Sequence, residues 1–299
     1  MFRTLCTALM VMLLTACQQG GAVDLKALTE KGLAGDPQAC RQLVELLGVT
    51  ENQLGEKVYP VVIEIGQPVV EPLLGAIDTP NPEQRERVIA ALGTLRVASA
   101  VEPITKVLAD ATLKRRYIAA WALGEIGTEA GIAPLVRALG DVELVVRRYA
   151  TLSLIKFNRA AVEPLVASLA GDDLLAVAGA IRALGDIGDK RALEPLLQQV
   201  DGPNRADVYL ALGKLRDPSA ESALIAGLDD ADWQVRMNAA MALGTVGRDR
   251  AAKALRLSLE DEVMVVREWS ARSLSVISGQ PVRYRDADGQ LVEPYSVYH

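Results

Sequence analysis

Residues 236–247 read RMNAAMALGTVG, and the Leu-Gly pair inside this stretch recurs along most of the chain, with the Gly sometimes replaced. The recurring leucines, called marker leucines below, are Leu92, Leu123, Leu154, Leu184, Leu212, Leu243 and Leu274. Their successive spacings are 31, 31, 30, 28, 31 and 31 residues. A second position keeps the same period and holds Pro72, Pro103, Pro134, Pro164, Pro195, Ala223 and Ala254. Two independent markers with one period indicate a tandem repeat.

Each repeat has the pattern of two helices joined by a short turn. Ile132, Leu135 and Leu139 follow one another at helical spacing, Gly140-Asp141 turns the chain, and a second helical pattern continues to Ile155. The proline of a unit falls in the first turn of its first helix, where the missing N–H costs nothing. One helix pair cannot bury its own apolar side, so the units must stack on one another.

Glycine has two expected roles in these units. The Gly of the Leu-Gly pair lets helices of neighbouring units approach closely. Gly127 and Gly188 follow the second helices and are placed to end them in the left-handed conformation.

The composition agrees with an all-α protein and argues against some partners. Half of the 299 residues are hydrophobic, only 4% are aromatic, and Ala and Leu are strong helix formers. The net charge of −6 argues against nucleic acid as a partner. Of the three cysteines, Cys40 lies among apolar residues and is expected to be a buried thiol.

Arginine and aspartate also recur with the repeat. An Arg stands seven residues before six of the marker leucines, and Val177 takes this place in the remaining unit. An Asp at the turn can cap the second helix and can pair with an Arg of its own or an adjacent unit. Because they recur in step with the repeat, we interpret these residues as a structural ladder rather than a catalytic set: Arg85, Arg116, Arg147, Arg205, Arg236 and Arg267, with Asp110, Asp141, Asp230 and Asp261.

The repeat unit resembles the short HEAT repeats, of the type first noted in phycobilisome lyases. The resemblance rests on segments such as AVEPLV at 161–166 and the stretch at 236–247, and covers about residues 70–278. It implies an all-α, right-handed α-solenoid of about seven two-helix repeats, whose second helices line the concave face. We expect a degenerate helical cap at 24–66, the repeat array at 67–279, and a small β-hairpin or extended tail at 280–299. In the cap, one helix is expected from Asp36-Pro37 through Leu47, and a second from Glu51 until Pro60 disturbs it.

The N-terminus has the pattern of an export signal. A positive charge at Arg3 precedes the apolar run 5–14, which is too short to span a membrane. Leu14-Thr15-Ala16-Cys17 resembles the lipobox of bacterial lipoproteins. This implies a signal peptide at 1–16, acylation of Cys17, and a lipidated tether at 17–23. Gln18 implies the outer membrane, facing the periplasm, if the organism is Gram-negative; the alternative is an ordinary secretory signal cut after Ala16.

No catalytic, cofactor or metal pattern is present. His299 is the only histidine, and there is no phosphate loop and no nucleophile with a histidine base. The chain thereby departs from the di-iron hydroxylases among HEAT proteins, which bind metal through His-Glu pairs. The Asp-x-Asp-Gly at 286–289 lacks the further ligands of a calcium loop and is interpreted as a turn. We therefore expect no enzyme activity and no cofactor.

The expected binding surface is a stripe on the second helices. Positions six and two before each marker leucine, and two after it, lie on one helix face. Aromatic, Met and Arg side chains, which are enriched at interface centres, gather on this stripe or beside it. The candidate groove residues are Tyr117, Trp121, Arg148, Tyr149, Leu152, Arg182, Met237, Met241, Trp269 and Arg272, with Glu268 among them.

The expected function is a lipid-anchored cell-envelope scaffold that binds a protein or peptide in this groove. The membrane is expected as a partner through the anchor, and nucleic acid is not. Two alternatives stay open. One is an enzyme or small-ligand carrier with a pocket in the same groove, and the other is a purely structural envelope component.

Overall fold

The computed structural model describes residues 24–294. The predictions made for the signal peptide, for Cys17 and for the tether lie outside the described residues, as do the last five residues. The chain divides into two compact units, unit 1 up to Val88 and unit 2 from Ile89, and each is described by itself. Apart from one two-stranded hairpin, the described elements are helices, and the fold is an all-α solenoid, as the sequence predicts.

Unit 1 is built of short helices whose apolar sides face one another. Its elements are α2 (Leu25–Leu33), α3 (Pro37–Leu46), α4 (Leu54–Ile65), α5 (Val70–Gly75) and the start of α6 (Pro82–Thr94), with 3-10 turns at Glu51–Gln53 and Gln67–Val69. Asp36 caps α3 by accepting a hydrogen bond from the N–H of Ala39 at 2.7 Å. Cys40 is a free, buried thiol, as predicted.

The sequence predicts that Pro60 disturbs a helix beginning at Glu51, and this prediction is wrong at both ends. Asn52 and Gln53 have left-handed backbone angles, so the α-helix begins only at Leu54. It then continues through Pro60 to Ile65, because Val58, Val62 and Ile65 are buried on one side of the helix. That burial outweighs the loss of one helical hydrogen bond at the proline.

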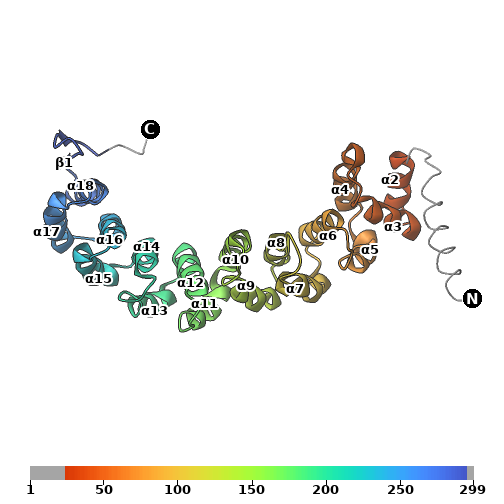
Figure 1. Cartoon of the computed structure of the whole chain (residues 1–299), viewed down its shortest axis with the longest axis horizontal. Coiled ribbons are helices and arrows are strands. Elements are labelled where there is room, and N and C mark those ends of the chain that lie inside the picture. The colour runs from red at the N-terminus through yellow and green to blue at the C-terminus, as the bar shows by residue number, and fades with distance from the viewer. Residues whose placement is uncertain (1–23, 295–299) are drawn as a thin grey trace, which may run out of the picture. The chain divides into compact units, whose positions relative to one another are not determined.

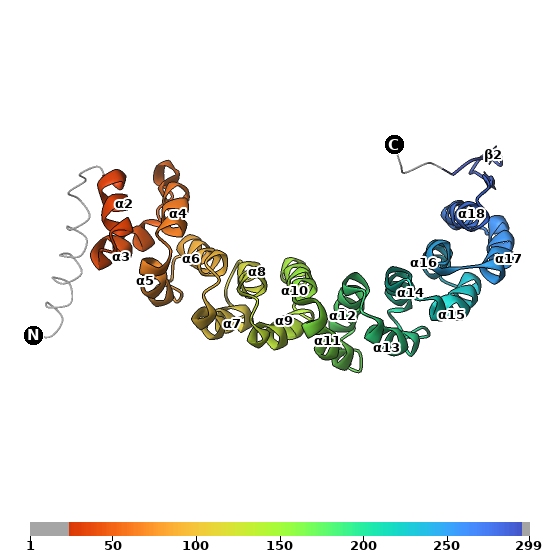
Figure 2. The same cartoon turned by 180° about the vertical axis from the view of Figure 1, so that it is seen from behind.

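Unit 2 consists of two rows of helices that follow the chain order (Figures 1 and 2). The first helices of the repeats form one row and the second helices form the other, on the inner side of the arc that unit 2 describes. The first row is α7 (Val101–Ala109), α9 (Ile132–Ala138), α11 (Val162–Ser168), α13 (Leu193–Leu197), α15 (Glu221–Ala226) and α17 (Asp249–Leu257). The second row is α8 (Tyr117–Ile126), α10 (Leu144–Phe157), α12 (Leu174–Ile187), α14 (Arg205–Leu215), α16 (Trp233–Val246) and α18 (Met264–Ser278).

Short 3-10 turns join the helices of unit 2. Those that lead into first helices are Ala98–Ala100, Glu129–Gly131, Asn158–Ala161, Lys190–Ala192 and Pro218–Ala220. Two others follow first helices, at Gly227–Asp229 and Ser258–Glu260. Each repeat proline from Pro103 to Pro195 is the third residue of its first helix, as expected. Gly127 and Gly188 end α8 and α12 in the left-handed conformation, which confirms their predicted role.

The core of unit 2 lies between the two rows. All its marker leucines are buried, and six of them are fully inaccessible. The second helices of neighbouring units approach closely where the marker is followed by Gly. A Cβ on Gly185 would lie 2.8 Å from the Cα of Ala211, and one on Gly213 would lie 2.7 Å from the Cβ of Ala242. The close approach predicted from the Leu-Gly pairs is therefore present.

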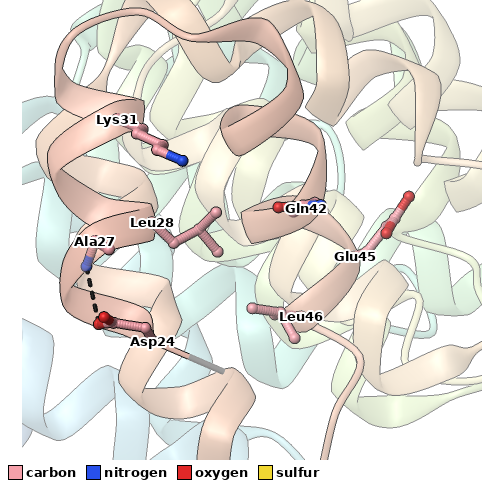
Figure 3. Close-up of a pocket in the computed structure, with 7 residues that line it drawn as sticks. All are labelled: Asp24, Ala27, Leu28, Lys31, Gln42, Glu45 and Leu46. Atoms are coloured by element: carbon pink, nitrogen blue, oxygen red, sulfur yellow. Dashed lines mark hydrogen bonds between the residues drawn. The ribbon is translucent and has the colours of Figure 1, made fainter. Parts of the chain in front are cut away.

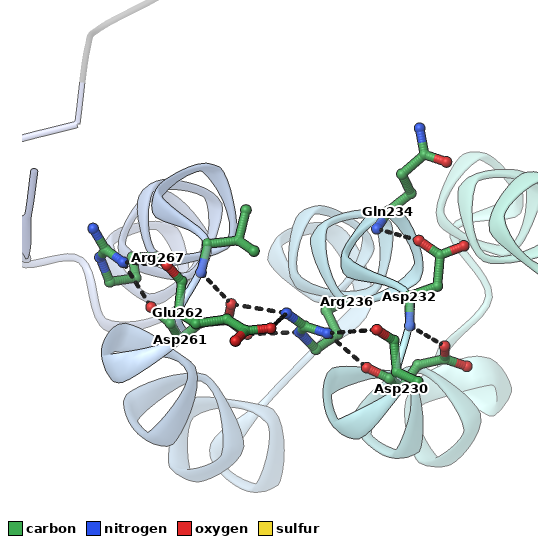
Figure 4. A network of polar contacts seen from close by, with 9 residues as sticks. Asp230, Asp232, Gln234, Arg236, Asp261, Glu262 and Arg267 are labelled. Carbon is green, nitrogen blue, oxygen red and sulfur yellow. Dashed lines mark hydrogen bonds and ion pairs between the residues drawn. The ribbon is translucent and has the colours of Figure 1, made fainter. Parts of the chain in front are cut away.

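The Arg-Asp ladder joins successive units. The carboxylate of Asp261 accepts hydrogen bonds from Arg236 of the preceding unit at 2.7 and 3.1 Å, and Asp230 is held in the same way by Arg205. Arg236 also donates to the backbone carbonyl of Asp230 in its own turn at 2.8 Å. Figure 4 shows this network across two neighbouring units. The sequence left own-unit and adjacent-unit pairing open, and the side-chain pairs join adjacent units.

The most buried member of the ladder is Arg116, which pairs with Asp141 of the next unit and with Glu143 at 3.0 Å. Burial alone would raise the pKa of Asp141, but hydrogen bonds from Arg116 and from the N–H of Glu143 hold that pKa below its ordinary value. The charged pair therefore forms part of the folded array.

Other ladder residues contact backbone. Arg85 donates to the carbonyl of Thr79 at 2.8 Å, and Arg147 donates to the carbonyl of Asp141. Asp110 accepts from the N–H of Thr112. Arg267, in the last unit, donates to the carbonyls of Asp261, Arg285 and Asp286, and so ties the final helix to the C-terminal hairpin.

A two-stranded hairpin follows α18, as the sequence predicts. Strands β1 (Tyr284–Arg285) and β2 (Leu291–Val292) are antiparallel, and Tyr284 pairs with Val292. The Asp286 carboxylate accepts from the N–H groups of Asp288 and Gln290, which makes this segment a turn rather than a set of outward ligands.

Breaking a buried ladder pair should cost more than breaking an exposed one. The Arg236 and Asp261 side chains are each 9% exposed, so Arg236→Ala leaves a buried carboxylate without its partner. We expect a loss of about 3 kcal/mol in the free energy of unfolding, measured with urea. The matched variant Arg205→Ala removes a pair that is more open to solvent and should cost clearly less. Equal losses would contradict this account of the ladder.

Adding a methyl group at a Leu-Gly pair should force two helices apart. Gly185→Ala places a Cβ 2.8 Å from the backbone of Ala211, and the overpacking should lower the free energy of unfolding by about 1–3 kcal/mol. Gly75→Ala is the control, because nothing lies within 4 Å of a Cβ added there. It should leave stability unchanged or raise it by up to about 1 kcal/mol. If Gly185→Ala leaves the free energy of unfolding unchanged, the helices are not closely packed at this position.

Candidate functional site

The inner stripe of unit 2 consists of the positions ten, six and two before each marker leucine and two after it. On α10 these are Leu144, Arg148, Leu152 and Lys156, which lie four residues apart on one helix face. The sequence-based stripe started one turn later, at position six. All the predicted groove residues lie on this stripe or beside it. The position ten before each marker leucine extends the stripe by one turn toward the helix starts.

Aromatic side chains gather where α8 meets α10. The rings of Tyr117 and Tyr149 lie 5.3 Å apart with their planes inclined by 33°. The Trp121 ring lies over Gly93, close enough that a Cβ added there would be 3.1 Å from it. All three aromatic side chains are half-buried, so each keeps one side packed and presents the other to solvent. Such packed aromatics form contact area at little entropic cost.

Arg148 and Leu152 continue this aromatic surface on α10. Leu152 is 48% exposed, and Arg148 is exposed with no hydrogen bond or ion pair to another described residue. An exposed guanidinium beside aromatic rings can bind a carboxylate through two parallel hydrogen bonds. These five residues, Tyr117, Trp121, Arg148, Tyr149 and Leu152, are called the aromatic–arginine cluster below.

Other charged residues of the stripe are occupied by partners on the neighbouring helix. Arg182 on α12 donates two hydrogen bonds of 2.9 Å to Asp207 on α14. Lys214 pairs with Asp186, and Lys156 pairs with Glu125. Arg182 was predicted as a binding residue, and the structure shows it engaged in a link between two units. Its role as a binding residue therefore stays a prediction.

A second group of predicted residues lies at the far end of unit 2. Met237 and Met241 are half-buried on α16, and Trp269 and Arg272 lie on α18. The Arg272 guanidinium carbon lies 4.9 Å from the Trp269 ring centre, and Arg272 also pairs with Glu268 at 2.7 Å. This arrangement fixes the Trp269 ring at the surface.

The sequence missed exposed apolar residues at the starts of α10 and α12. Val142, Leu144, Val145, Leu174 and Leu175, called the apolar lip below, are all exposed. Trp233 and Met264 occupy the same repeat position as Leu144 and are exposed as well. Extending the four-residue spacing by one turn toward the N-terminal ends of the helices would have found Leu144, Leu174, Trp233 and Met264. Val142, Val145 and Leu175 do not lie on that spacing.

The described residues contain no arrangement suited to metal chemistry, since no group of three or more His, Cys, Asp or Glu side chains converges there. One hollow lies between α2 and α3 of unit 1 (Figure 3). Leu28 and Leu46 face it, and Asp24 at its rim is occupied in capping α2 through the N–H of Ala27. Among helices in the described part of the chain, none is both long and apolar enough to cross a membrane.

The stacked helix pairs and the surface on their second helices define a helical-repeat protein. The model of HEAT repeats matches three overlapping segments, 70–155, 132–208 and 201–275, which together span most of the chain. The chain therefore belongs to the HEAT-repeat family, as its sequence pattern predicts. A search of curated proteins found no match.

Several solved structures resemble the chain in fold. Human deoxyhypusine hydroxylase in complex with glycerol is 21% identical, with 82% of this chain and 97% of that chain covered and a TM-score of 0.36. An engineered protein is 21% identical over 85% and 79% of the two chains, with a TM-score of 0.43. The CpcE–CpcF complex of phycocyanin lyase from Nostoc sp. PCC7120 is 22% identical over 68% and 86%, with a TM-score of 0.37.

Proposed function

We propose that this protein is a lipid-anchored scaffold of the bacterial cell envelope, and that unit 2 binds a protein or peptide along its inner stripe. The observation that carries the proposal is the aromatic–arginine cluster on α8 and α10. It combines ring stacking between two units with an exposed guanidinium that has no partner among the described residues. Packed aromatics and Arg are the residue types that dominate binding energy at interfaces.

The charges around the cluster narrow the chemistry of the partner. Lys156 and Arg182 are neutralised by carboxylates, whereas Arg148 is not. A bound segment would therefore place an apolar or aromatic side chain on Tyr149 and Leu152 and a carboxylate on Arg148. An open helical face with these features supports binding rather than catalysis, and we propose no enzymatic reaction for it.

The anchor is the second part of the proposal. The lipobox-like Leu14-Thr15-Ala16-Cys17 supports acylation at Cys17, and Gln18 supports the outer membrane, facing the periplasm, in a Gram-negative cell. Two or more acyl chains on Cys17 would hold the protein stably at a bilayer. The tether at 17–23 would then leave the solenoid free to reach its partner.

Removing the cluster should weaken partner capture. We expect crosslinking in intact cells to capture a protein, and Trp121→Ala with Arg148→Ala to reduce that capture by at least about tenfold. Arg148→Glu alone should have a similar effect without altering packing, because this side chain is exposed. The control is Arg256→Ala with Leu257→Ala on α17, where both residues are exposed on the opposite row. Capture unchanged in both cluster variants would reject the groove.

The anchor can be tested separately with an alkyne analogue of palmitate. The wild-type protein should incorporate the label and sediment with membranes. Cys17→Ser should abolish the label and release the protein, whereas Cys40→Ala should stay labelled, because Cys40 is a buried thiol. Persistent labelling of Cys17→Ser would exclude Cys17 as the acylated residue.

A further inference from the structure

Exposed apolar side chains of unit 2 are concentrated in the apolar lip. Val142 is 83% exposed, Leu144 is 70% exposed, and Leu174 and Leu175 are 51% and 50% exposed. The lip lies at the starts of α10 and α12, at one edge of the array rather than in the middle of the inner stripe. An apolar surface of this kind commonly marks a site of interaction.

The turns at this edge of the array are packed against one another. The carboxylate of Asp173, at the start of α12, lies so close to Gly140 that a Cβ added there would be 2.1 Å from it. The Asn204 side chain, in the turn before α14, donates a hydrogen bond to the carbonyl of Leu174 at 3.1 Å. The turns before α10, α12 and α14 therefore form one continuous surface that includes the lip.

On the α8 side of the lip, the charges without described partners are positive. The turn before α8 contains Lys114 and Arg115 together with Asp110. Lys114 is exposed and forms no hydrogen bond or ion pair with another described residue. Arg148, one turn from Leu144 on α10, is a second exposed cation without such a partner.

The charged groups within the lip are already paired. Arg116 forms ion pairs with Asp141 and Glu143. The Arg147 guanidinium donates hydrogen bonds to the carbonyls of Asp141 and Val142. The first turn of α10 therefore presents apolar side chains with no free charge among them.

On the α14 side of the lip, the charges are negative. Segments 169–175 and 199–204 contain Asp172, Asp173 and Asp201 and no Lys or Arg. Asp172 and Asp201 are exposed, and neither forms an ion pair with another described residue. The lip therefore separates a positive end of this edge from a negative end.

An apolar surface with opposite charges at its two ends is complementary to a second copy of itself. In a contact with two-fold symmetry, both copies use the same surface and every pair of contacts occurs twice. The joint between α10 and α12 lies midway along the four second helices from α8 to α14. A two-fold axis through this joint places the start of α10 against the start of α12 of the other copy, and the turn before α8 against the turn before α14. Apolar side chains then meet apolar side chains, and Lys114 meets Asp201.

We propose that the apolar lip binds a second copy of this chain, edge to edge and in opposite directions, about this two-fold axis. Leu144 of each copy packs against Leu174 of the other, and two Lys114–Asp201 pairs lie at the ends of the contact. Because the axis runs from the outer row of helices to the inner row, both inner stripes stay open on the same side. The dimer goes beyond the proposed function and leaves the aromatic–arginine cluster available to its own partner.

The dimer is tested by sedimentation of the purified full-length protein over a range of concentrations. The wild type should show a monomer–dimer equilibrium. Leu144→Ser with Leu174→Ser should raise the dissociation constant at least about tenfold, and circular dichroism should show an intact fold because both leucines are exposed. Leu257→Ser is the matched control, because Leu257 is 80% exposed on α17, and it should dimerise like the wild type. A wild type that stays monomeric at every concentration, or a lip variant that dimerises like the wild type, would overturn the proposal.

Charge exchange tests the two-fold geometry. Lys114→Asp and Asp201→Lys should each weaken the dimer, because each change places like charges opposite one another at both ends of the contact. The two changes in one chain should restore the dimer, since each pair is then reversed rather than lost. A double variant that dimerises no better than the single variants would contradict this arrangement.

The dimer and the proposed function can fail independently. Trp121→Ala should reduce partner capture and leave the dimer unchanged. A monomeric wild type whose captured protein is lost in the Leu144→Ser and Leu174→Ser variant would overturn the dimer and assign the lip to the partner instead.

Discussion

The structure depends on one constraint, which is that a pair of short helices cannot cover its own apolar side. The marker leucine of each unit is therefore buried in a core shared with its neighbours. The second helices must pack closely to exclude water from that core. The small residues at the crossing points, such as Gly185 against Ala211, set this distance. Because the shared core occupies one side of every second helix, the opposite side is left to form the inner stripe.

The Arg-Asp ladder follows from the length of the repeat. In a period of 31 residues, an Arg six residues after an Asp stands 25 residues before the next Asp. The guanidinium therefore reaches its own turn through a carbonyl and the next turn through a carboxylate, as Arg236 does with Asp230 and Asp261. The ladder thus fixes the spacing of units, while the inner stripe remains free to vary from unit to unit.

Periodicity made the architecture predictable, because every unit repeats the same burial pattern. The sequence could not decide between the two partners of each ladder Asp, since spacings of 6 and 25 residues both allow contact until the stacking is known. It missed the apolar lip because the stripe was counted from position six, and Leu144 and Leu174 resemble ordinary core residues at a helix start. It misjudged Pro60 because tertiary burial of Val58 and Val62 outweighs a local preference.

The joint between α10 and α12 differs from its neighbours. Val177 replaces the ladder Arg there, and among the described residues no side-chain hydrogen bond or ion pair links the unit of α9 and α10 to the unit of α11 and α12. Apolar contacts tolerate sliding, whereas hydrogen bonds hold a fixed direction. The relative orientation of two neighbouring units is therefore least constrained at this joint. The joint lies directly beneath the apolar lip. A ligand bound to the lip would bridge the two units and restrict their relative motion at this joint.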